Sequence, residues 1–489
     1  MEWTLDQARK GWKPMVHPIQ HVGVPGYEFQ TGVIWDGALV FGPLGFTDLK
    51  VMRADMTTLG ASPMHVSFLY GDPMHFVDRK GTNNPLIRRK LWGGRLPIPT
   101  VETRDGDLLW SETVFAHLLG RKMSDGLSPK PSDKLVTHVL MTVANRGYGR
   151  ETGHLWVHFG DVSQVAFGYK SRQGPGLSPS IAYDYKAPFA IVPSPSINSG
   201  SADLSVHPGS RTGGTSRTSW TSRTSRTDGS DSKFQNPESN IRAVRFALPA
   251  PKKGKLVWND DKKLIEWQVP LDPGESAQLR LAIPYGLIDE TTAKKMLAVD
   301  PRKAEREVVD FWTNLQYGPG QIETGDAWIN DYLVAVAGQM SQQVAYRHHP
   351  GLWMYKTSPN HYEGYWPCNA AKALPTFDFR GLTKINEDVL GGFLQVQTSE
   401  VRGLDREGMG GGKALKGEGY AKVDGFLGNF GEWTANPLLL SHGLAMWALA
   451  NHYRVTRDDA WLRGTVQSSK SKVESVKSAS RAPRGVAGH

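Results

Sequence analysis

The spacing of apolar residues changes once along this chain of 489 residues, close to residue 300. Before that point, residues 136–145 and 153–161 have the β-branched and aromatic composition of strands, and Gly and Pro fall between such runs at short intervals, as in 23–45. This rhythm is typical of an antiparallel sandwich and differs from the strand–helix alternation of parallel sheets. After it, apolar residues recur at helical spacing. We therefore predict an antiparallel β-sandwich over residues 1–290, followed by a helical domain.

Two further segments belong to the predicted β-rich domain. The run 241–249 has strand character, and 255–286 is interpreted as two strand pairs with Asn-Asp-Asp and Asp-Pro-Gly turns. Residues 196–239 interrupt the pattern, because Ser-Arg-Thr recurs there with almost no apolar side chains. Such a composition buries too little surface to offset the entropy lost on folding, so we predict a low-complexity, disordered insertion.

Beyond residue 290 the sequence predicts a linker helix within 291–320 and a helical domain over 321–462. The linker helix is centred on 304–315, and the first helix of the domain is expected over 321–340. Two stripes at helical spacing support this assignment: Ile329, Leu333, Val336, Met340 and Val344, and then Leu382, Ile385, Val389, Phe393 and Val396.

Two more helices are expected in the same domain. A short one covers 368–377 and ends near Pro375, where the ring removes a backbone donor. The run 436–453 is apolar nearly all round, so we expect that helix to be buried on most sides.

The formal net charge of +9 is concentrated at the end of the chain. Residues 463–489 carry six Lys or Arg and one Glu, which gives +5, and they show no apolar period. We predict a disordered basic tail there. The remaining residues are close to neutral and have no basic stripe, which argues against nucleic acid as a partner.

Other partners and cofactors lack a sequence signal. No run of about 18 apolar residues predicts a membrane span, and residues 1–20 lack the apolar core of a secretory signal. The default location is therefore cytoplasmic, unless the true start lies upstream. Cys368 is the single cysteine, so no internal disulfide is expected. His348 and His349 are adjacent rather than four apart, which argues against a metal site on one helix. The glycine run 408–412 lacks the strand and helix that flank a phosphate-binding loop, and no GxSxG motif of a serine hydrolase occurs. We therefore predict no metal or cofactor.

Residues 351–382 hold the densest group of aromatic and polar side chains. Sugars present apolar C–H faces and many hydroxyl groups, so their sites combine aromatic rings with acids, amides and His. A carboxylate among aromatic rings can also hold its proton, as a general acid requires. The competing interpretation is an aromatic core seam with one solvated glutamate. The residues singled out are Trp353, His361, Tyr362, Glu363, Tyr365, Trp366, Asn369 and Asp378.

A second candidate segment, 403–437, is rich in glycine and lies between two predicted helices. A stretch of about 30 residues without regular structure in a compact domain usually has a function. We expect a substrate loop at the mouth of a helical barrel, and the competing interpretation is a plain surface loop. Its candidate site residues are Glu418, Asp424, Glu432 and Trp433.

The order of these segments resembles the six-hairpin glycosidase superfamily, whose (α/α)6 barrel often follows a β-sandwich and a linker helix. The likeness is carried by AEREVVDFWTNL (304–315), in the place of the linker helix, and QIETGDAWINDYLVAVAGQM (321–340), in that of the first barrel helix. It extends over 303–462 and looks most like an uncharacterised bacterial branch, whereas the amino-terminal half is similar only in architecture.

The resemblance implies chemistry on a glycosidic bond by two carboxylates, one that protonates the leaving oxygen and one that activates water. Glu363 and Glu432 are the candidates for the acid or for a sugar ligand, with Asp378 and Asp424 behind them. The expected function is that of a glycoside hydrolase-like protein acting on an oligosaccharide, inverting if the family habit holds. Two alternatives stay open: a disaccharide phosphorylase-like enzyme, and a non-catalytic carbohydrate-binding or structural remnant.

The helical part is short for such a barrel. Twelve helices of about 11–12 residues, with their loops, need roughly twice the chain that follows residue 303. We therefore expect a partial (α/α)6-type domain in a truncated chain, with catalysis conditional on the missing part. A partial barrel also leaves apolar helix faces uncovered, such as that of 436–453.

Overall fold

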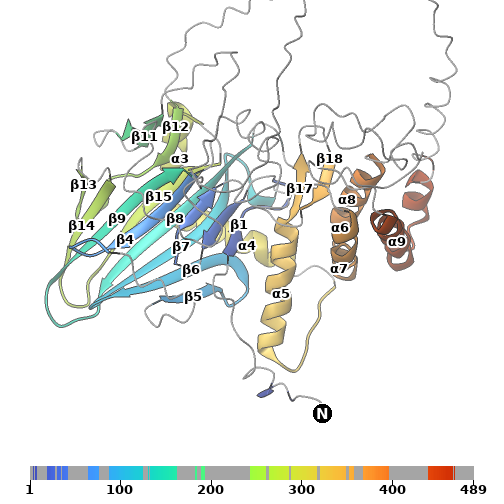
Figure 1. Cartoon of the computed structure of the whole chain (residues 1–489), viewed down its shortest axis with the longest axis horizontal. Helices are drawn as coiled ribbons and strands as arrows, with labels where there is room; N and C mark the ends of the chain where they lie inside the picture. Colours follow the sequence, from blue (N-terminus) through green and yellow to red (C-terminus); the bar gives the residue numbers. More distant parts are fainter. Residues whose placement is uncertain are drawn as a thin grey trace, which may run out of the picture.

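The structure is a computed structural model in which antiparallel β-sheets form the amino-terminal half and helices follow. Figure 1 shows the sheets on the left, α5 beside them and most other helices on the right. The predicted order of a β-rich part and a helical part is confirmed. The residues that the structure describes are 4, 6–7, 19–27, 30–34, 36–41, 64–75, 87–124, 130, 133–161, 182–183, 189–192, 243–259, 264–285, 288–316, 320–347, 352–356, 367–395, 439–465 and 467.

One sheet has seven strands in the order β1-β2-β3-β4-β9-β14-β13. All neighbouring strands are antiparallel, and β9 confirms the strand predicted at 153–161. The strands are β1 (Ile19–Val22), β2 (Thr31–Ile34), β3 (Leu39–Phe41), β4 (Met64–Tyr70), β9 (Glu151–Asp161), β13 (Lys255–Asn259) and β14 (Leu264–Leu271).

The second sheet has nine strands, in the order β10-β11-β12-β15-β8-β7-β6-β5 with β16 paired to β12. The strands predicted at 136–145 and 241–249 are confirmed as β8 and β12. The strands are β5 (Ile87–Trp92), β6 (Leu96–Asp105), β7 (Leu108–Leu119), β8 (Lys134–Asn145), β10 (Ala182–Tyr183), β11 (Phe189–Val192), β12 (Ala243–Ala247), β15 (Ser276–Pro284) and β16 (Ile288–Asp289).

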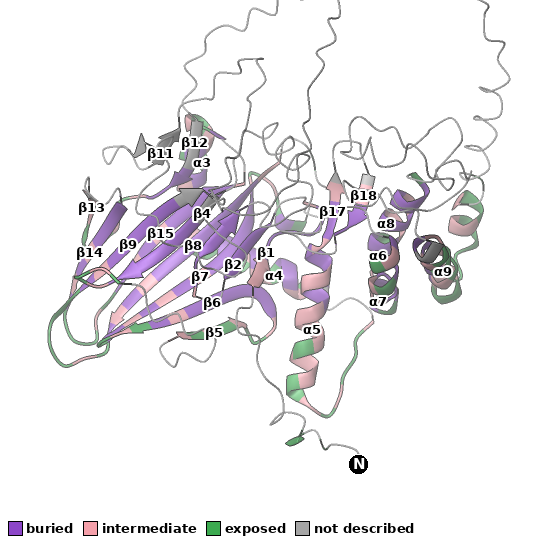
Figure 2. Ribbon diagram, viewed as in Figure 1, coloured by how far each residue is buried: buried purple, intermediate pink, exposed green. Residues whose placement is uncertain are grey.

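The two sheets pack against each other through large aromatic side chains. Trp267 of β14 and Trp110 of β7 meet edge to face with ring centres 6.1 Å apart, and both are buried. Phe159 of β9 stacks on Phe246 of β12 with ring centres 3.8 Å apart. Each pair joins one sheet to the other, and burial of such rings contributes strongly to the stability of the sandwich. Figure 2 shows the long central strands as largely buried.

The prediction of two strand pairs within 255–286 is wrong in its second half. β13 and β14 form a pair, but the Asp-Pro-Gly turn carries the chain from β14 into β15 of the opposite sheet. The reason is Asn145, at the end of β8. Its backbone N–H donates to the Glu275 carbonyl at 2.9 Å, and its own carbonyl accepts from Gly274 N–H at 3.0 Å. These bonds hold the turn against the nine-stranded sheet.

The helical part contains nine labelled elements after β16 in the described residues, seven helices and two strands. A helix, α4, lies where the linker helix is predicted, whereas α5 begins later than expected because Asp326 caps it by accepting from the Trp328 and Ile329 N–H groups. The elements are α3 (Glu290–Ala298), α4 (Pro301–Gln316), α5 (Ala327–Gln342), β17 (Val344–Arg347), β18 (Leu352–Tyr355), α6 (Pro367–Ala373), α7 (Pro375–Phe379), α8 (Thr383–Gln395) and α9 (Leu439–Thr456).

Other helix predictions need correction. The single short helix expected at 368–377 is two helices, since Pro375 occupies the first turn of α7 instead of ending a helix. The helix expected to be buried on most sides, α9, exposes 54% of Met446 and 46% of Trp447. A run that is apolar all round does not reveal which face finds a partner. By contrast, Ile385, Val389 and Phe393 of the second predicted stripe are buried on α8.

Several organisational predictions fall on residues outside those described. The proposed insertion at 196–239 lies outside them entirely, and of the predicted tail only 463–465 and 467 lie within them. The domain limits at 290, 320 and 462 stay predictions.

One carboxyl group lies in an unusual place within the sandwich. Glu112 of β7 is 1% exposed, and within the described part of the chain neither of its carboxyl oxygens has a hydrogen-bond partner. Burial raises the pKa of Glu112 well above its ordinary value, and the nearby charge of Asp36 adds to this. The carboxyl also sits against Gly37, where a Cβ would collide with Oε2 of Glu112 and where the φ of +89° favours glycine.

We predict that Glu112→Gln increases stability at neutral and alkaline pH. Below pH 4.5, the ordinary pKa of this group, Glu112 is protonated in both the folded and the unfolded state, so its ionisation does not lower the stability of the wild type. As pH rises, the unfolded state releases the proton first, and the wild type loses about 1.4 kcal/mol per pH unit until the folded pKa is reached. Urea midpoints measured between pH 4 and pH 9 should therefore diverge, with the variant above the wild type. The control is Glu151→Gln on β9, which removes an exposed charge; an equal divergence there would contradict the assignment.

Candidate functional site

Three of the twelve predicted site residues lie in described segments: Trp353, Asn369 and Asp378. The other nine lie outside them, so their roles stay predictions. They are His361, Tyr362, Glu363, Tyr365, Trp366, Glu418, Asp424, Glu432 and Trp433.

Trp353 lies on an aromatic hairpin at the junction of the sandwich and the helices. It is opposite Tyr346 in the β17–β18 register, and the two rings meet edge to face at 5.4 Å. The hairpin is bonded to the sandwich side through Gly26, whose N–H donates to the Val344 carbonyl at 2.8 Å and whose carbonyl accepts from Tyr346 N–H at 2.9 Å. Trp353 is therefore held by its ring contact with Tyr346 and by the backbone bonds between its hairpin and Gly26.

Asn369 lies on α6 and is exposed. Residues 357–366, which include Glu363, separate this helix from the hairpin of Trp353. Both ends of that segment are anchored, since Lys356 is 1% exposed and Pro367 is buried in α6. Cys368, one position before Asn369 on the same helix, is partly exposed.

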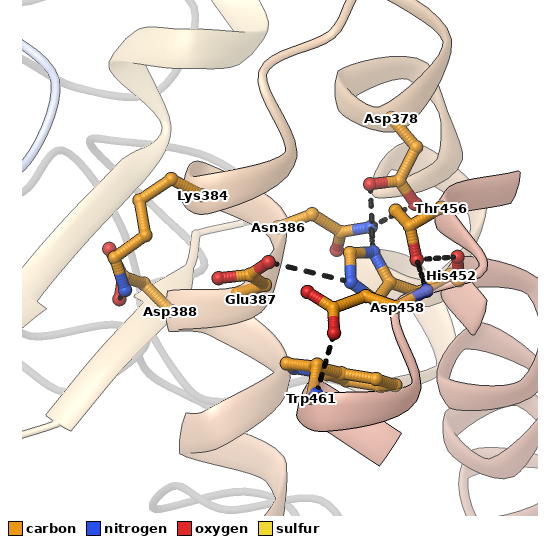
Figure 3. Close-up of polar contacts among 9 residues, drawn as sticks. All are labelled: Asp378, Lys384, Asn386, Glu387, Asp388, His452, Thr456, Asp458 and Trp461. Carbon is orange, nitrogen blue, oxygen red and sulfur yellow. Dashed lines mark hydrogen bonds and ion pairs between the residues drawn. The ribbon is translucent and has the colours of Figure 1, made fainter.

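Asp378 is at the centre of a buried polar cluster that joins three helices (Figure 3). One carboxylate oxygen, Oδ1, lies 2.8 Å from Nδ1 of His452 on α9. The other, Oδ2, accepts from the Asn386 side chain of α8 at 2.6 Å. The side chains of Asp378 and His452 have no exposed surface. We call these three residues the Asp378 cluster.

The imidazole of His452 is held on its other side as well. Its Nε2 lies 3.9 Å from Oε1 of Glu387, and its ring meets that of Trp461 edge to face with centres 4.3 Å apart. The backbone around it is fixed by Thr456, whose hydroxyl donates to the His452 carbonyl at 2.9 Å. Two carboxylates thus flank one imidazole, although only Glu387 reaches the surface, with 25% of its side chain exposed.

These surroundings limit what Asp378 can do chemically. A general acid has to approach the oxygen that it protonates, whereas both oxygens of Asp378 are occupied and sealed from solvent. Charged groups buried with such partners hold neighbouring elements in one arrangement, and removing a partner is costly. The geometry favours a positioning role for Asp378, and its catalytic assignment stays a prediction.

Sequence reasoning missed the two partners of Asp378. Asn386 resembles any polar residue of a surface helix, although it follows the buried Ile385. His452 offered a usable signal, since it closes a line of fully or nearly buried positions at helical spacing. That line consists of Ser441, Ala445, Ala448 and His452. A polar side chain at the end of such a line needs a buried partner.

The described segments hold no group of three His, Cys, Asp or Glu side chains arranged for a metal ion. No helix among them is long and apolar enough to cross a membrane.

The sequence matches no protein-family model and no curated protein. Among solved structures it resembles a protein described as a kojibiose phosphorylase from the human microbiome, with 8% identity and a TM-score of 0.47 over 90% of this chain. It also resembles the family GH92 inverting mannosidase from Bacteroides thetaiotaomicron, with 10% identity and a TM-score of 0.24 over 77% of this chain. This chain spans 54% and 45% of their respective lengths, or about half of each. Both are members of the six-hairpin glycosidase superfamily; at these TM-scores the likeness supports no conclusion about activity.

We predict that Asp378→Ala lowers the free energy of unfolding by about 3 kcal/mol, because it leaves two buried polar partners without a carboxylate. The change is measured by urea unfolding, followed by the fluorescence of Trp461 and the other tryptophans. The matched control is Asp388→Ala on α8, which removes a surface pair with Lys384 at 2.5 Å and should cost less than about 0.5 kcal/mol. Equal losses would show that the Asp378 cluster does not stabilise the helices.

Proposed function

We propose that this chain acts on the glycosidic bond of an oligosaccharide by paired-carboxylate chemistry, in the manner of a glycoside hydrolase. The observation that supports the proposal is the setting of Trp353. This half-buried ring lies on a hairpin bonded to Gly26, and the chain leads from it into the segment of Glu363, between the buried Lys356 and Pro367. An aromatic platform beside a segment of acids and aromatic rings has the chemistry of sugar recognition.

In this proposal Glu363 protonates the leaving oxygen and Glu432 activates the attacking water. Trp353 stacks on the apolar face of a sugar ring, and the exposed amide of Asn369 bonds to its hydroxyl groups. Two carboxyl groups about 6.5–9.5 Å apart leave room for the water of an inverting reaction. Asp424 is the alternative candidate for a catalytic carboxylate. The other proposed substrate ligands are His361, Tyr362, Tyr365, Trp366, Glu418 and Trp433.

The purified chain is expected to release the aryl alcohol from a panel of aryl glycosides. Glu363→Gln should lower kcat by about 10³-fold, since general acid catalysis contributes roughly 10²–10⁴-fold. A colorimetric assay of initial rates measures both effects. The control is Glu323→Gln, which replaces an exposed carboxylate between α4 and α5 and should leave kcat unchanged.

Inorganic phosphate separates the alternatives in the same assay. Turnover that requires phosphate and yields a sugar phosphate would identify a phosphorylase-like enzyme. Sugar binding without turnover in either buffer would identify a non-catalytic carbohydrate-binding protein. An unchanged kcat in Glu363→Gln would remove this residue from the mechanism.

A further inference from the structure

A cavity of about 1050 Å³ opens between the end of β7 and the helices α3 and α4. Its volume is at the upper end of the range for small-molecule sites. None of its lining residues belongs to the hairpin, to α6–α9 or to the predicted sugar site. The lining falls into two groups, an apolar floor and a polar rim.

The floor is built from buried apolar side chains that are already packed in the core. Met123, Ala304, Phe311 and Leu315 are each 9% exposed or less. Beside them lies His117, which is 6% exposed and has its Nε2 3.0 Å from Oε2 of Glu307. This imidazole–carboxylate contact fixes one face of α4 against β7, so the cavity wall is part of the folded core.

The rim carries both signs of charge in equal number. Arg121, Lys122 and Lys303 face the cavity together with Asp300, Glu307 and Asp310, and so the formal charge of the lining is zero with His117 neutral. A site for phosphate would show an excess of cations, and a site for an organic cation would show an excess of carboxylates or an open aromatic cage.

Three rim groups are exposed and have no hydrogen bond or ion pair to any described residue: Lys122, Asp310 and Asn314. Together they offer an ammonium donor, carboxylate acceptors and an amide that both donates and accepts. Asp310 and Asn314 are four positions apart on α4, so they lie on the same side of the helix, on either side of Phe311 in sequence. Free donors and acceptors above an apolar floor suit a molecule with many hydroxyl groups and one apolar face.

We propose that this cavity is a second carbohydrate site, which binds a neutral mono- or disaccharide through Asp310, Asn314 and Lys122 above the Phe311 floor. The inference goes beyond the proposed function, because binding here uses none of the residues proposed to catalyse. It would hold a glycan on the sandwich side of α4 and thereby raise the local concentration of a chain substrate.

Hydrogen–deuterium exchange of the full chain, with D-glucose, D-mannose and maltose as separate probes at millimolar concentrations, tests the proposal. At least one sugar should slow exchange in peptides covering 117–124 and 301–316. Asp310→Ala should raise the sugar concentration for half-maximal protection by about tenfold, the usual effect of losing one charged hydrogen bond. Asp310 is exposed and makes no contact that folding needs, and Glu323→Ala is the matched control away from the cavity.

A second variant fills the cavity without touching its polar groups. Ala298→Trp places an indole at an exposed lining position and should abolish the protection. Glu363→Gln should keep it, so failure of catalysis and failure of this site are distinguishable. Protection by inorganic phosphate instead of sugar, no protection by any of the three sugars, or full protection in both cavity variants would overturn the proposal.

Discussion

The partly buried guanidinium of Arg280 determines how the helices are attached to the sandwich. Arg280 lies on β15, and it donates to the carbonyls of Met296, Leu297 and Val299 at 2.8, 3.1 and 2.7 Å. The last carbonyls of α3 have no partner within their own helix, and the cation also meets the negative end of the helix dipole. Because α4 begins at Pro301, directly after this anchor, the direction of every later helix starts from a fixed point on the sheet.

The anchor continues as a row of polar side chains beneath α4. The Arg280 guanidinium reaches Nδ1 of His138 at 3.4 Å, and the His138 ring lies 5.9 Å from that of His117, which contacts Glu307 of α4. Burial, with help from the Arg280 charge, lowers the pKa of His138 well below its ordinary value, so it is neutral and can accept from the guanidinium. The cavity beside α4 thus has one wall set by the sheet and another by the helix.

Local sequence patterns predict the elements whose burial follows one face. The stripe through Ile385 and Val389 is of this kind, because its helical spacing specifies the side that is buried. The strand at 136–145 is buried along most of its length, and its β-branched residues predict it instead. Local patterns fail where a residue far away in the sequence determines the course of the backbone. The turn after β14 is held by Asn145, whose side chain bonds to Leu271, 126 residues along the chain. Asp378 likewise stands out as an acid among aromatic residues, while the residues that bind it come from segments that no local pattern connects.

The Asp378 cluster also bears on the proposed chemistry, although none of its members needs to touch a substrate. α6 and α7 have 7 and 5 residues, and helices this short do not persist in water without tertiary support. Asp378 fixes α7, which follows the segment of Glu363, to α8 and α9, which precede and follow the segment of Glu432. Paired-carboxylate catalysis depends on the separation of two acids, and small displacements of catalytic groups are costly. The Asp378 cluster joins the helices that flank both segments, so it is the part of the described structure best placed to set that separation.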